Sequence, residues 1–507
     1  MRLSVRNLVG VVAIAAAGLI AAGGAVTAET WKLELKRLEA VSEVGILDSN
    51  PLADWVYRQV SPQHVSFRLT AKSAVPDAGA EVFAKIVKKE PAKYQSERPL
   101  RGVVKLGSDQ YAFVLDMKDA KSKAYDRLYF DLNHNGDLTD DKVIEAVKTP
   151  GLGLFFGGGS RESVFPRVDL TINVDGPKTD YAFFLRAESS SLPGRERAAV
   201  VSLTAAAYRV GEITLDGKKH RMALVDSNGN GRFDDAVKVP DKAEAPDGEI
   251  EPMPGDALLL DPQNAKPPED FFGEPVADYQ QWVSKLARID DRFYDLKVAP
   301  AGDQITLTPS SVPLGYLASP NEGLMAAMWS DVGFLQFVKG KSKPVAVPEG
   351  KWRLTSYTIE SKEEKKPAGK EKTAAKKKDA EKEPLKTSLL GAIARAVFGV
   401  SGPEDEPRMG PASYSMVNAR AIKECKPVTV RKGQTVTLPF GPPYRPVVTA
   451  SHDVLASGHA SLSLSLVGSG GETVNYMLVD GRRPPAPQFT ISTVKGEVVQ
   501  EGRFEYG

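Results

Sequence analysis

The chain has 507 residues, 42% of them hydrophobic and 26% charged, a composition that suits ordinary globular cores and a length that predicts about three domains. The formal net charge of +1 creates no overall field that would attract nucleic acid or a membrane surface. Cys425 is the sole cysteine, which excludes an intramolecular disulfide.

Residues 1–28 have the layout of a secretory signal peptide. Arg2 and Arg6 precede an apolar run over 8–25, which ends in small residues at 26–28. Cleavage after residue 28 would remove two arginines and no acid, which changes the net charge from +1 to −1. We therefore expect a secreted, periplasmic or cell-envelope protein with no transmembrane segment after cleavage, and a single membrane anchor is the alternative.

Strand patterns dominate the remaining sequence. Alternating β-branched and aromatic residues flank short Gly-containing turns, which predicts β-hairpins at 101–116, 211–226, 292–309 and 487–507. Helical periodicity is limited to two short candidates, at 278–286 and 389–398. The sequence therefore predicts a mainly β fold of several antiparallel β-sandwich-like modules in tandem. The predicted modules span 29–150, 151–262, 263–360 and 388–507.

The segment FDLNHNGDLTDDK, which begins at Phe130, places oxygen-bearing side chains at alternate positions of a tight loop. A hard cation such as calcium needs six to eight oxygens at one point, and Gly at the sixth position permits the sharp turn. Counted from Asp131, the candidate ligands are Asp131, Asn133, Asn135, the carbonyl of Asp137, and then Thr139, Asp140 or Asp141. The sequence therefore predicts a calcium site in this first loop.

The same pattern recurs 95 residues later, which indicates an internal repeat of two related β modules. The second loop, DSNGNGRFDD, again follows a strand pattern and has Gly at its sixth position. Its candidate ligands are Asp226, Asn228, Asn230, the carbonyl of Arg232, and then Asp234 or Asp235. The alternative for both loops is an Asx-turn whose acids are only solvated.

Both loops resemble EF-hand-type calcium loops, including the variants in dockerins and in the β-propeller cation loops of integrins. The twelfth position departs from the bidentate Glu of an EF-hand, because Lys142 and Val237 stand there, and the flanking segments read as strands. The resemblance therefore implies a structural clasp for one ion and not a calcium sensor. Asn at two ligand positions favours a weak dissociation constant, on the order of 10⁻⁴–10⁻³ M.

Ser361–Thr387 holds ten Lys, six acids and no aromatic residue, so it is predicted to be a disordered linker. It is interpreted as a solvated insertion between strands, with an electrostatic tether to an anionic polymer as the alternative. Just before it, the segment VAVPEGKWRLTSYTIE resembles the edge segment of transthyretin-like and carboxypeptidase-regulatory-like β-sandwiches. That likeness implies a fold and no function.

No motif in the sequence names a reaction, and no catalytic residue is predicted. One hypothesis is a non-catalytic secreted or envelope protein, stiffened by calcium, with a binding or structural role toward a cell-surface or extracellular polymer. The other is a secreted hydrolase that cleaves polysaccharide with paired carboxylates, which need no fixed spacing in sequence. Acids gathered in an aromatic-lined groove away from the loops would favour the hydrolase.

Overall fold

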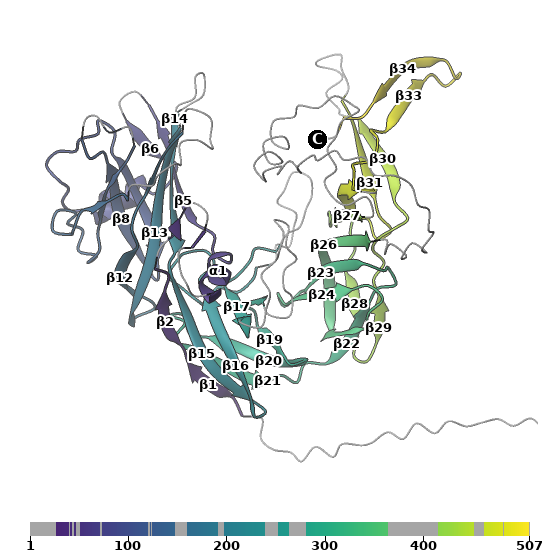
Figure 1. Cartoon of the computed structure of the whole chain (residues 1–507), viewed down its shortest axis with the longest axis horizontal. Helices are drawn as coiled ribbons and strands as arrows, with labels where there is room; N and C mark the ends of the chain where they lie inside the picture. Colours follow the sequence, from purple (N-terminus) through teal and green to yellow (C-terminus); the bar gives the residue numbers. More distant parts are fainter. Residues whose placement is uncertain are drawn as a thin grey trace, which may run out of the picture.

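The computed structural model shows a mainly β protein whose described residues form two parts, seen as the two arms of Figure 1. The structure describes residues 27–39, 41–42, 45–46, 51–70, 73–119, 122, 124–147, 160–190, 197–238, 252–262, 280–362, 414–450, 461–479 and 481–505. Residues 1–26 of the predicted signal peptide, residues 363–387 of the predicted linker and the helix candidate at 389–398 lie outside these ranges.

The N-terminal part, coloured from purple to teal in Figure 1, contains four larger antiparallel sheets and one two-stranded sheet. The first, in the order β10-β9-β8-β7, comprises β7 (Leu100–Leu106), β8 (Asp109–Asp116), β9 (Arg127–Phe130) and β10 (Ile144–Glu145). The second, in the order β11-β13-β14-β5-β6 with β12 also paired to β13, comprises β5 (Gln63–Leu69), β6 (Ala74–Pro76), β11 (Ser160–Val164), β12 (Val168–Asn173), β13 (Lys178–Ser190) and β14 (Arg197–Ala205).

The other two sheets of this part include the first strands of the chain. The third, in the order β18-β17-β16-β15-β2, comprises β2 (Glu34–Arg37), β15 (Ala207–Leu215), β16 (Lys218–Val225), β17 (Ala257–Leu260) and β18 (Gln280–Trp282). The fourth, in the order β1-β21-β20-β19, comprises β1 (Glu29–Lys32), β19 (Leu286–Ile289), β20 (Arg292–Val298) and β21 (Gln304–Pro309). The pair of β3 (Val41–Ser42) and β4 (Gly45–Ile46) stands alone.

The C-terminal part, green to yellow in Figure 1, is built on one large sheet. That sheet, in the order β24-β23-β26-β27-β32-β31-β30 with β28 also paired to β26, comprises β23 (Leu324–Ser330), β24 (Leu335–Lys339), β26 (Gly350–Lys362), β27 (Tyr414–Arg420), β28 (Val428–Val430), β30 (Arg445–Ala450), β31 (Leu462–Val467) and β32 (Thr473–Leu478). A three-stranded sheet holds β22 (Leu314–Ala318), β25 (Val345–Pro348) and β29 (Thr435–Thr437), and a separate hairpin holds β33 (Gln488–Ser492) and β34 (Val498–Arg503). The β22–β29 pair is parallel, an exception to the predicted antiparallel pattern.

The strands form where apolar side chains recur at every second position. In β12, Val168, Leu170 and Ile172 are buried, while the intervening Asp169 and Thr171 are exposed. Side chains alternate between the two faces of a strand, so this spacing places one face on the core and the other in water. The predicted mainly β fold of several antiparallel sheets is confirmed, as are the four predicted hairpins.

One buried cluster of hydrophobic side chains runs through the N-terminal part, from Leu33 to Leu307. Its sheets cross the predicted boundary at 150/151, because β5 pairs with β14 along its whole length, for example Val65 with Val201. Whether the predicted boundaries separate units that fold independently stays a prediction. The strands before and after the boundary at 150/151 share a sheet and a hydrophobic core.

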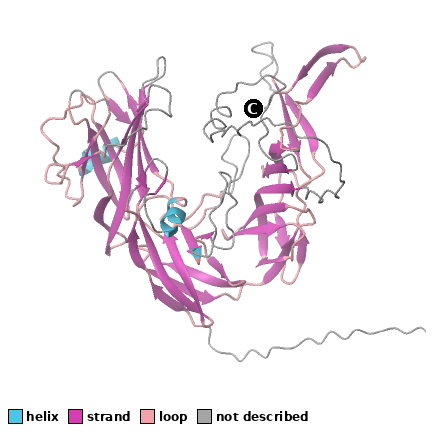
Figure 2. Ribbon diagram, viewed as in Figure 1, coloured by secondary structure: helices cyan, strands magenta, loops and turns pink. Residues whose placement is uncertain are grey.

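Two short helices went unpredicted, α1 (Pro51–Tyr57) and α2 (Ala80–Ile86), which Figure 2 colours cyan. Pro51 stands at the first helical position, where its missing N–H removes no helical hydrogen bond. Seven residues are too few to give a clear period in sequence. The helix predicted at 278–286 is wrong, since β18 and the first residue of β19 fall within it.

The two parts meet where β19 and β20 of the N-terminal part contact the core and β24 of the C-terminal part. Leu286 and Phe293 belong to the hydrophobic core of the C-terminal part, although their strands lie in a sheet of the N-terminal part. Arg288 Nη1 donates to Gln336 Oε1 at 3.0 Å across the same junction. The contact between the parts is therefore both apolar and hydrogen-bonded.

In the C-terminal part, β26 and β27 are neighbours in the sheet although residues 363–413 separate them in sequence. Lys362 pairs with Tyr414, so the first two residues of the predicted linker, Ser361 and Lys362, lie at the end of β26. The sheet therefore joins strands of the predicted modules 263–360 and 388–507. Within the ranges that the structure describes, no helix is long and apolar enough to cross a membrane.

Gly302, in the turn between β20 and β21, has φ of 69°, and a Cβ there would lie 2.6 Å from the Phe233 ring. We expect Gly302→Ala to lower the free energy of unfolding by about 2–5 kcal/mol, because it adds left-handed strain and a clash. Gly217 is the matched control: its φ is 77°, but no atom lies within 4 Å of the added Cβ. Gly217→Ala should cost only about 1–2 kcal/mol. Equal losses in urea unfolding would contradict the packing argument.

Candidate metal-binding loops

Each predicted calcium loop follows the second strand of an antiparallel pair. The first loop (131–142) follows β9, which pairs with β8, and the second loop (226–237) follows β16, which pairs with β15. Each of these strands ends in a fully buried apolar residue, Phe130 or Val225. The buried strand end carries the first loop residue inward with it, so Asp131 and Asp226 are themselves buried.

The two loops have the same backbone shape at their fourth and sixth positions. Both positions are left-handed in each loop, with φ of 58° at His134 and 83° at Gly136, and 68° at Gly229 and 79° at Gly231. Left-handed residues at this spacing turn successive backbone N–H groups toward one side of the loop. The repeat read from the sequence is therefore also a repeat of conformation.

The first Asp of each loop accepts the backbone N–H groups of the fifth and sixth positions. Asp131 accepts from Asn135 and Gly136 through separate carboxylate oxygens, both at 3.0 Å. In the second loop, Asp226 accepts from Asn230 at 3.2 Å and from Gly231 at 2.7 Å. These bonds fold each loop back over its first residue.

The Asn side chains and one later Asp meet at the centre of each loop. In the second loop, the Nδ2 groups of Asn228 and Asn230 donate to Asp235 Oδ2 at 2.9 and 2.6 Å. The equivalent bonds of the first loop run to Asp140, at 2.7 Å from Asn135 and 3.5 Å from Asn133. The tenth position therefore supplies the closing carboxylate of both loops.

Two candidate positions turn their side chains away from these centres. The seventh residue of the first loop, Asp137, pairs with Lys89 at 2.8 Å, a hydrogen bond that lowers the pKa of Asp137 to about 2. In the second loop, Arg232 pairs with Asp234 at 2.9 Å. Of the two predicted closing residues, Asp235 therefore joins the centre and Asp234 does not. The seventh residues keep only their main-chain carbonyls as candidate ligands.

Asp141 and Asp256 have matching roles, although only Asp141 lies within a loop. Asp141 accepts the backbone N–H of Leu132, the second position of the first loop, at 3.1 Å. In the second loop the corresponding N–H, of Ser227, is accepted by Asp256 at 2.9 Å, and the N–H of Asp235 is accepted by the same carboxylate at 2.9 Å. Asp256 directly precedes β17, so the sequence pattern of the loop could not reveal it.

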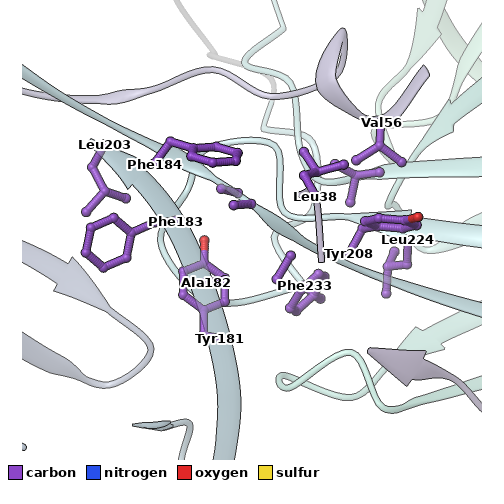
Figure 3. Close-up of a cluster of buried hydrophobic side chains, with 14 of the residues drawn as sticks. Leu38, Val56, Tyr181, Ala182, Phe183, Phe184, Leu203, Tyr208, Leu224 and Phe233 are labelled. Atoms are coloured by element: carbon purple, nitrogen blue, oxygen red, sulfur yellow. The ribbon is translucent and has the colours of Figure 1, made fainter. Parts of the chain in front are cut away.

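The eighth position of each loop was also missed, and it anchors the loop to a hydrophobic core. Leu138 and Phe233 are buried, each 1% exposed. Leu138 packs with Phe83 of α2, and Phe233 belongs to the main cluster, as does Tyr181 of β13 (Figure 3). In both loop sequences, a single apolar residue among Asp, Asn and Gly could have indicated this buried position.

Crowding and burial shift the pKa values of several loop carboxyls. Burial raises the pKa of Asp141 to about 6, and the nearby Asp140 and Asp131 act in the same direction. Burial likewise raises the pKa values of Asp226 and Asp256, and the charge of Asp226 raises that of Asp256 further. Burial therefore makes these three carboxyls easier to protonate than free ones, and neighbouring carboxylates add to this effect at Asp141 and Asp256.

The donor set of each loop is mixed. In the described part of the chain, no three His, Cys, Asp or Glu side chains converge closely enough to hold a metal ion by themselves. A cation in either loop would thus also need Asn side-chain and main-chain oxygens, which suit calcium and do not suit zinc. The Asn amides now direct their N–H groups at the closing Asp, so they would have to rotate to present oxygen.

Comparisons of the chain with protein-family models, with curated proteins and with solved structures found no match. The interpretation of the loops therefore rests on their own geometry.

We expect the calcium-free protein to lose stability as the pH rises from about 4 to about 6. The pKa of Asp141 is about 6 in the folded chain and about 4 in an unfolded one. Between these values the folded state binds more protons, so unfolding becomes easier as the pH rises. Asp226 and Asp256 shift in the same direction.

Melting temperatures measured in chelator from pH 4 to pH 7 test this expectation. The variant Asp141→Asn should lose part of the decline. A melting temperature that stays flat or rises across this window would contradict the crowding described above.

Proposed function

We propose that this chain is an exported protein, secreted or held in the cell envelope, whose two loops each bind one calcium ion. In this proposal it has no catalytic activity, and the ions stiffen β modules that serve a binding or structural role. The observation that carries the proposal is the matched geometry of the loops, in which equivalent residues make equivalent hydrogen bonds.

The charge balance of each loop supports a cation. Three carboxylates serve each loop, and they are Asp131, Asp140 and Asp141 in the first and Asp226, Asp235 and Asp256 in the second. In the described arrangement only the partial positive charges of amide N–H groups face the closing Asp. A calcium ion would supply two full positive charges at the same place, and the Asn side-chain oxygens could coordinate it.

The lack of disulfides gives such ions a structural purpose. Cys425 is unpaired and half-buried, and burial raises the pKa of its thiol to about 11. The thiol therefore stays protonated at neutral pH and is a poor nucleophile. An exported chain without cross-links depends on other contacts to hold its long loops, and a bound ion can provide them.

A non-catalytic role is supported by what the buried acids do. Asp116 and Glu472 lie outside the loops, and each accepts two backbone N–H bonds, at 2.7–2.8 Å and 2.7–2.9 Å respectively. Such carboxylates stabilise turns. A described cavity of about 270 Å³ contains Asp216 and Asp291. Both are already bonded to arginines, Asp216 to Arg292 and Asp291 to Arg288.

A binding role is supported by the hairpin of β33 and β34, which forms its own two-stranded sheet at the end of the C-terminal part (Figure 1). Val494, Val498 and Val499 are largely exposed on it. A two-stranded hairpin is only marginally stable in water by itself, and exposed apolar side chains on such a hairpin are available to a partner. An extracellular or cell-surface polymer remains the proposed partner.

Calcium binding is tested by calorimetric titration of the chelator-stripped mature chain. We expect a dissociation constant on the order of 10⁻⁴–10⁻³ M. A free calcium concentration ten times the dissociation constant should then add about 1.4 kcal/mol to the free energy of unfolding per site. Asp131→Ala should remove the first site and Asp235→Ala the second. Asp234→Ala is the matched control and should leave both sites intact, because Asp234 pairs with Arg232.

The absence of both heat and a melting shift at about 10 mM calcium, which is tenfold or more above the expected constant, would reduce both loops to ordinary turns. Equal effects of Asp234→Ala and Asp235→Ala would contradict the assignment of the closing residue.

The polysaccharide hydrolase remains the second candidate, and the cavity that contains Asp216 and Asp291 is the described place where it could act. We expect the calcium-loaded chain to retain a polysaccharide on a glycan screen without releasing new reducing ends. Reducing ends that appear with time, and that disappear in Asp291→Asn, would favour the hydrolase over the binding protein.

A further inference from the structure

His220 of β16 is a buried histidine that lies between two carboxylates, and its side chain is only 2% exposed. Its Nδ1 lies 2.8 Å from Oδ2 of Asp261, which directly follows β17 in the same sheet. Its Nε2 lies 3.0 Å from Oδ2 of Asp290, in the turn between β19 and β20. The imidazole thus connects the third and fourth sheets of the N-terminal part, whose strands meet near the junction of the two arms in Figure 1.

The two ring nitrogens of His220 are held differently. Asp261 is a fixed partner, because it also accepts the backbone N–H of Arg221 at 2.8 Å and donates its own N–H to the Arg221 carbonyl at 2.7 Å. Nε2 is buried and makes no hydrogen bond of good geometry to any described residue, although Asp290 is close. A neutral ring therefore keeps its proton on Nδ1 and turns the lone pair of Nε2 toward the Asp290 carboxylate.

The turn that carries Asp290 is strained and doubly acidic. Asp290 and Asp291 are its central residues, with φ of 48° and 63°, at positions where Asn-Gly is preferred. Lys218 Nζ donates to Asp290 Oδ1 at 2.6 Å, and Asp291 pairs with Arg288. The hydrogen bond from Lys218 and the charge of His220 hold the pKa of Asp290 below its ordinary value. Two side chains of β16 therefore hold this turn through its charge.

Of these two side chains, His220 is the one shielded from water. Lys218 is 60% exposed, so water and salt screen its bond to Asp290. β15 places Ile213 opposite His220 and so brings no charge to that position. Beside the turn, Arg292 and Asp216 are exposed and paired with each other. The charge state of His220 is therefore the variable part of this contact.

From this geometry we propose that His220 is a pH-sensitive link, which holds the β19–β20 turn when the ring is charged and releases it when the ring is neutral. The inference goes beyond the proposed function and does not depend on calcium. In the charged ring, Nε2 presents a proton to Asp290, whereas the neutral ring presents a lone pair to the same carboxylate. Histidine changes charge between about pH 5 and pH 8, so the link forms in mildly acidic solution and is lost as the pH rises.

Release of the turn reaches the contact between the two parts of the chain. Asp291 pairs with Arg288, and Arg288 Nη1 donates to Gln336 of β24 in the C-terminal part at 3.0 Å. A turn that moves away from β16 carries Asp291 with it and so disturbs the position of Arg288. The proton on His220 thereby regulates how firmly β19 and β20 are joined to β24.

The test measures hydrogen–deuterium exchange of the full mature chain at about pH 6 and about pH 8, within the range in which histidine titrates. Rates are corrected for the intrinsic pH dependence of amide exchange. The amides of β19, β20 and their turn should then exchange about tenfold faster at the higher pH, the usual order for the loss of one charge-assisted hydrogen bond. The amides of β24 should change in the same direction.

Variants of the two partners identify the titrating contact. Asp290→Asn should remove the pH difference, because an uncharged amide does not respond to the charge of the ring, and Asn suits the left-handed turn position. His220→Gln, whose side chain cannot become charged, should behave in the same way. Lys218→Ala is the matched control: it removes the exposed bond to the same carboxylate and leaves His220 in place, so the pH difference should remain.

Equal corrected exchange at the two pH values in the unaltered chain would overturn the proposal, as would faster exchange at the lower pH. A pH difference that persists in Asp290→Asn, or that Lys218→Ala abolishes, would also overturn it, because another group would then be responsible. Unchanged exchange in β24 would overturn the extension to the contact between the parts. None of these outcomes bears on the proposed binding of calcium.

Discussion

A carboxylate removed from water must be given hydrogen-bond donors, and this requirement shapes the N-terminal part. Asp131 and Asp226 are buried because each follows a buried strand. An unpaired charge there would cost several kcal/mol. The chain meets the demand with the N–H groups of two later residues, which forces left-handed turns at the fourth and sixth positions. The shape of the loops and the left-handed residues within them follow from this constraint.

Much of this fold could be predicted because strand formation is a local matter. The hairpin β15–β16 could be predicted because apolar and polar residues alternate on both sides of the turn at Asp216-Gly217. The partners across a sheet could not be predicted in the same way. The pairing of β5 with β14 joins segments more than 100 residues apart, and no local pattern records which of many similar strands will meet. The 95-residue interval between the loops is about the length of one sandwich module, which is why separate modules were predicted. The strands of the N-terminal part also share one hydrophobic core.

The candidate site divides along the same line. The first, third, fifth and sixth positions could be predicted from spacing, because adjacent residues of one loop must lie close together. Asp256 could not be predicted, since it arrives from the start of β17. The choice between Asp234 and Asp235 also required the structure, because it depends on Arg232, whose side chain reaches both Asp234 and Asp175. The functional consequence of the loops stays a prediction.

The strands nearest the N-terminus have the most distant partners. β1 pairs with β21, with Trp31 opposite Ile305, and β2 pairs with β15. During synthesis at about 5–20 residues per second, β1 would wait roughly 15–60 s for the strand that completes its sheet. Until then its edge and its share of the core are exposed to water, to chaperones and to other nascent chains. The order of pairing thus keeps the newly made N-terminal region without its completed sheets. A chain segment that has not yet folded can still pass through a narrow pore.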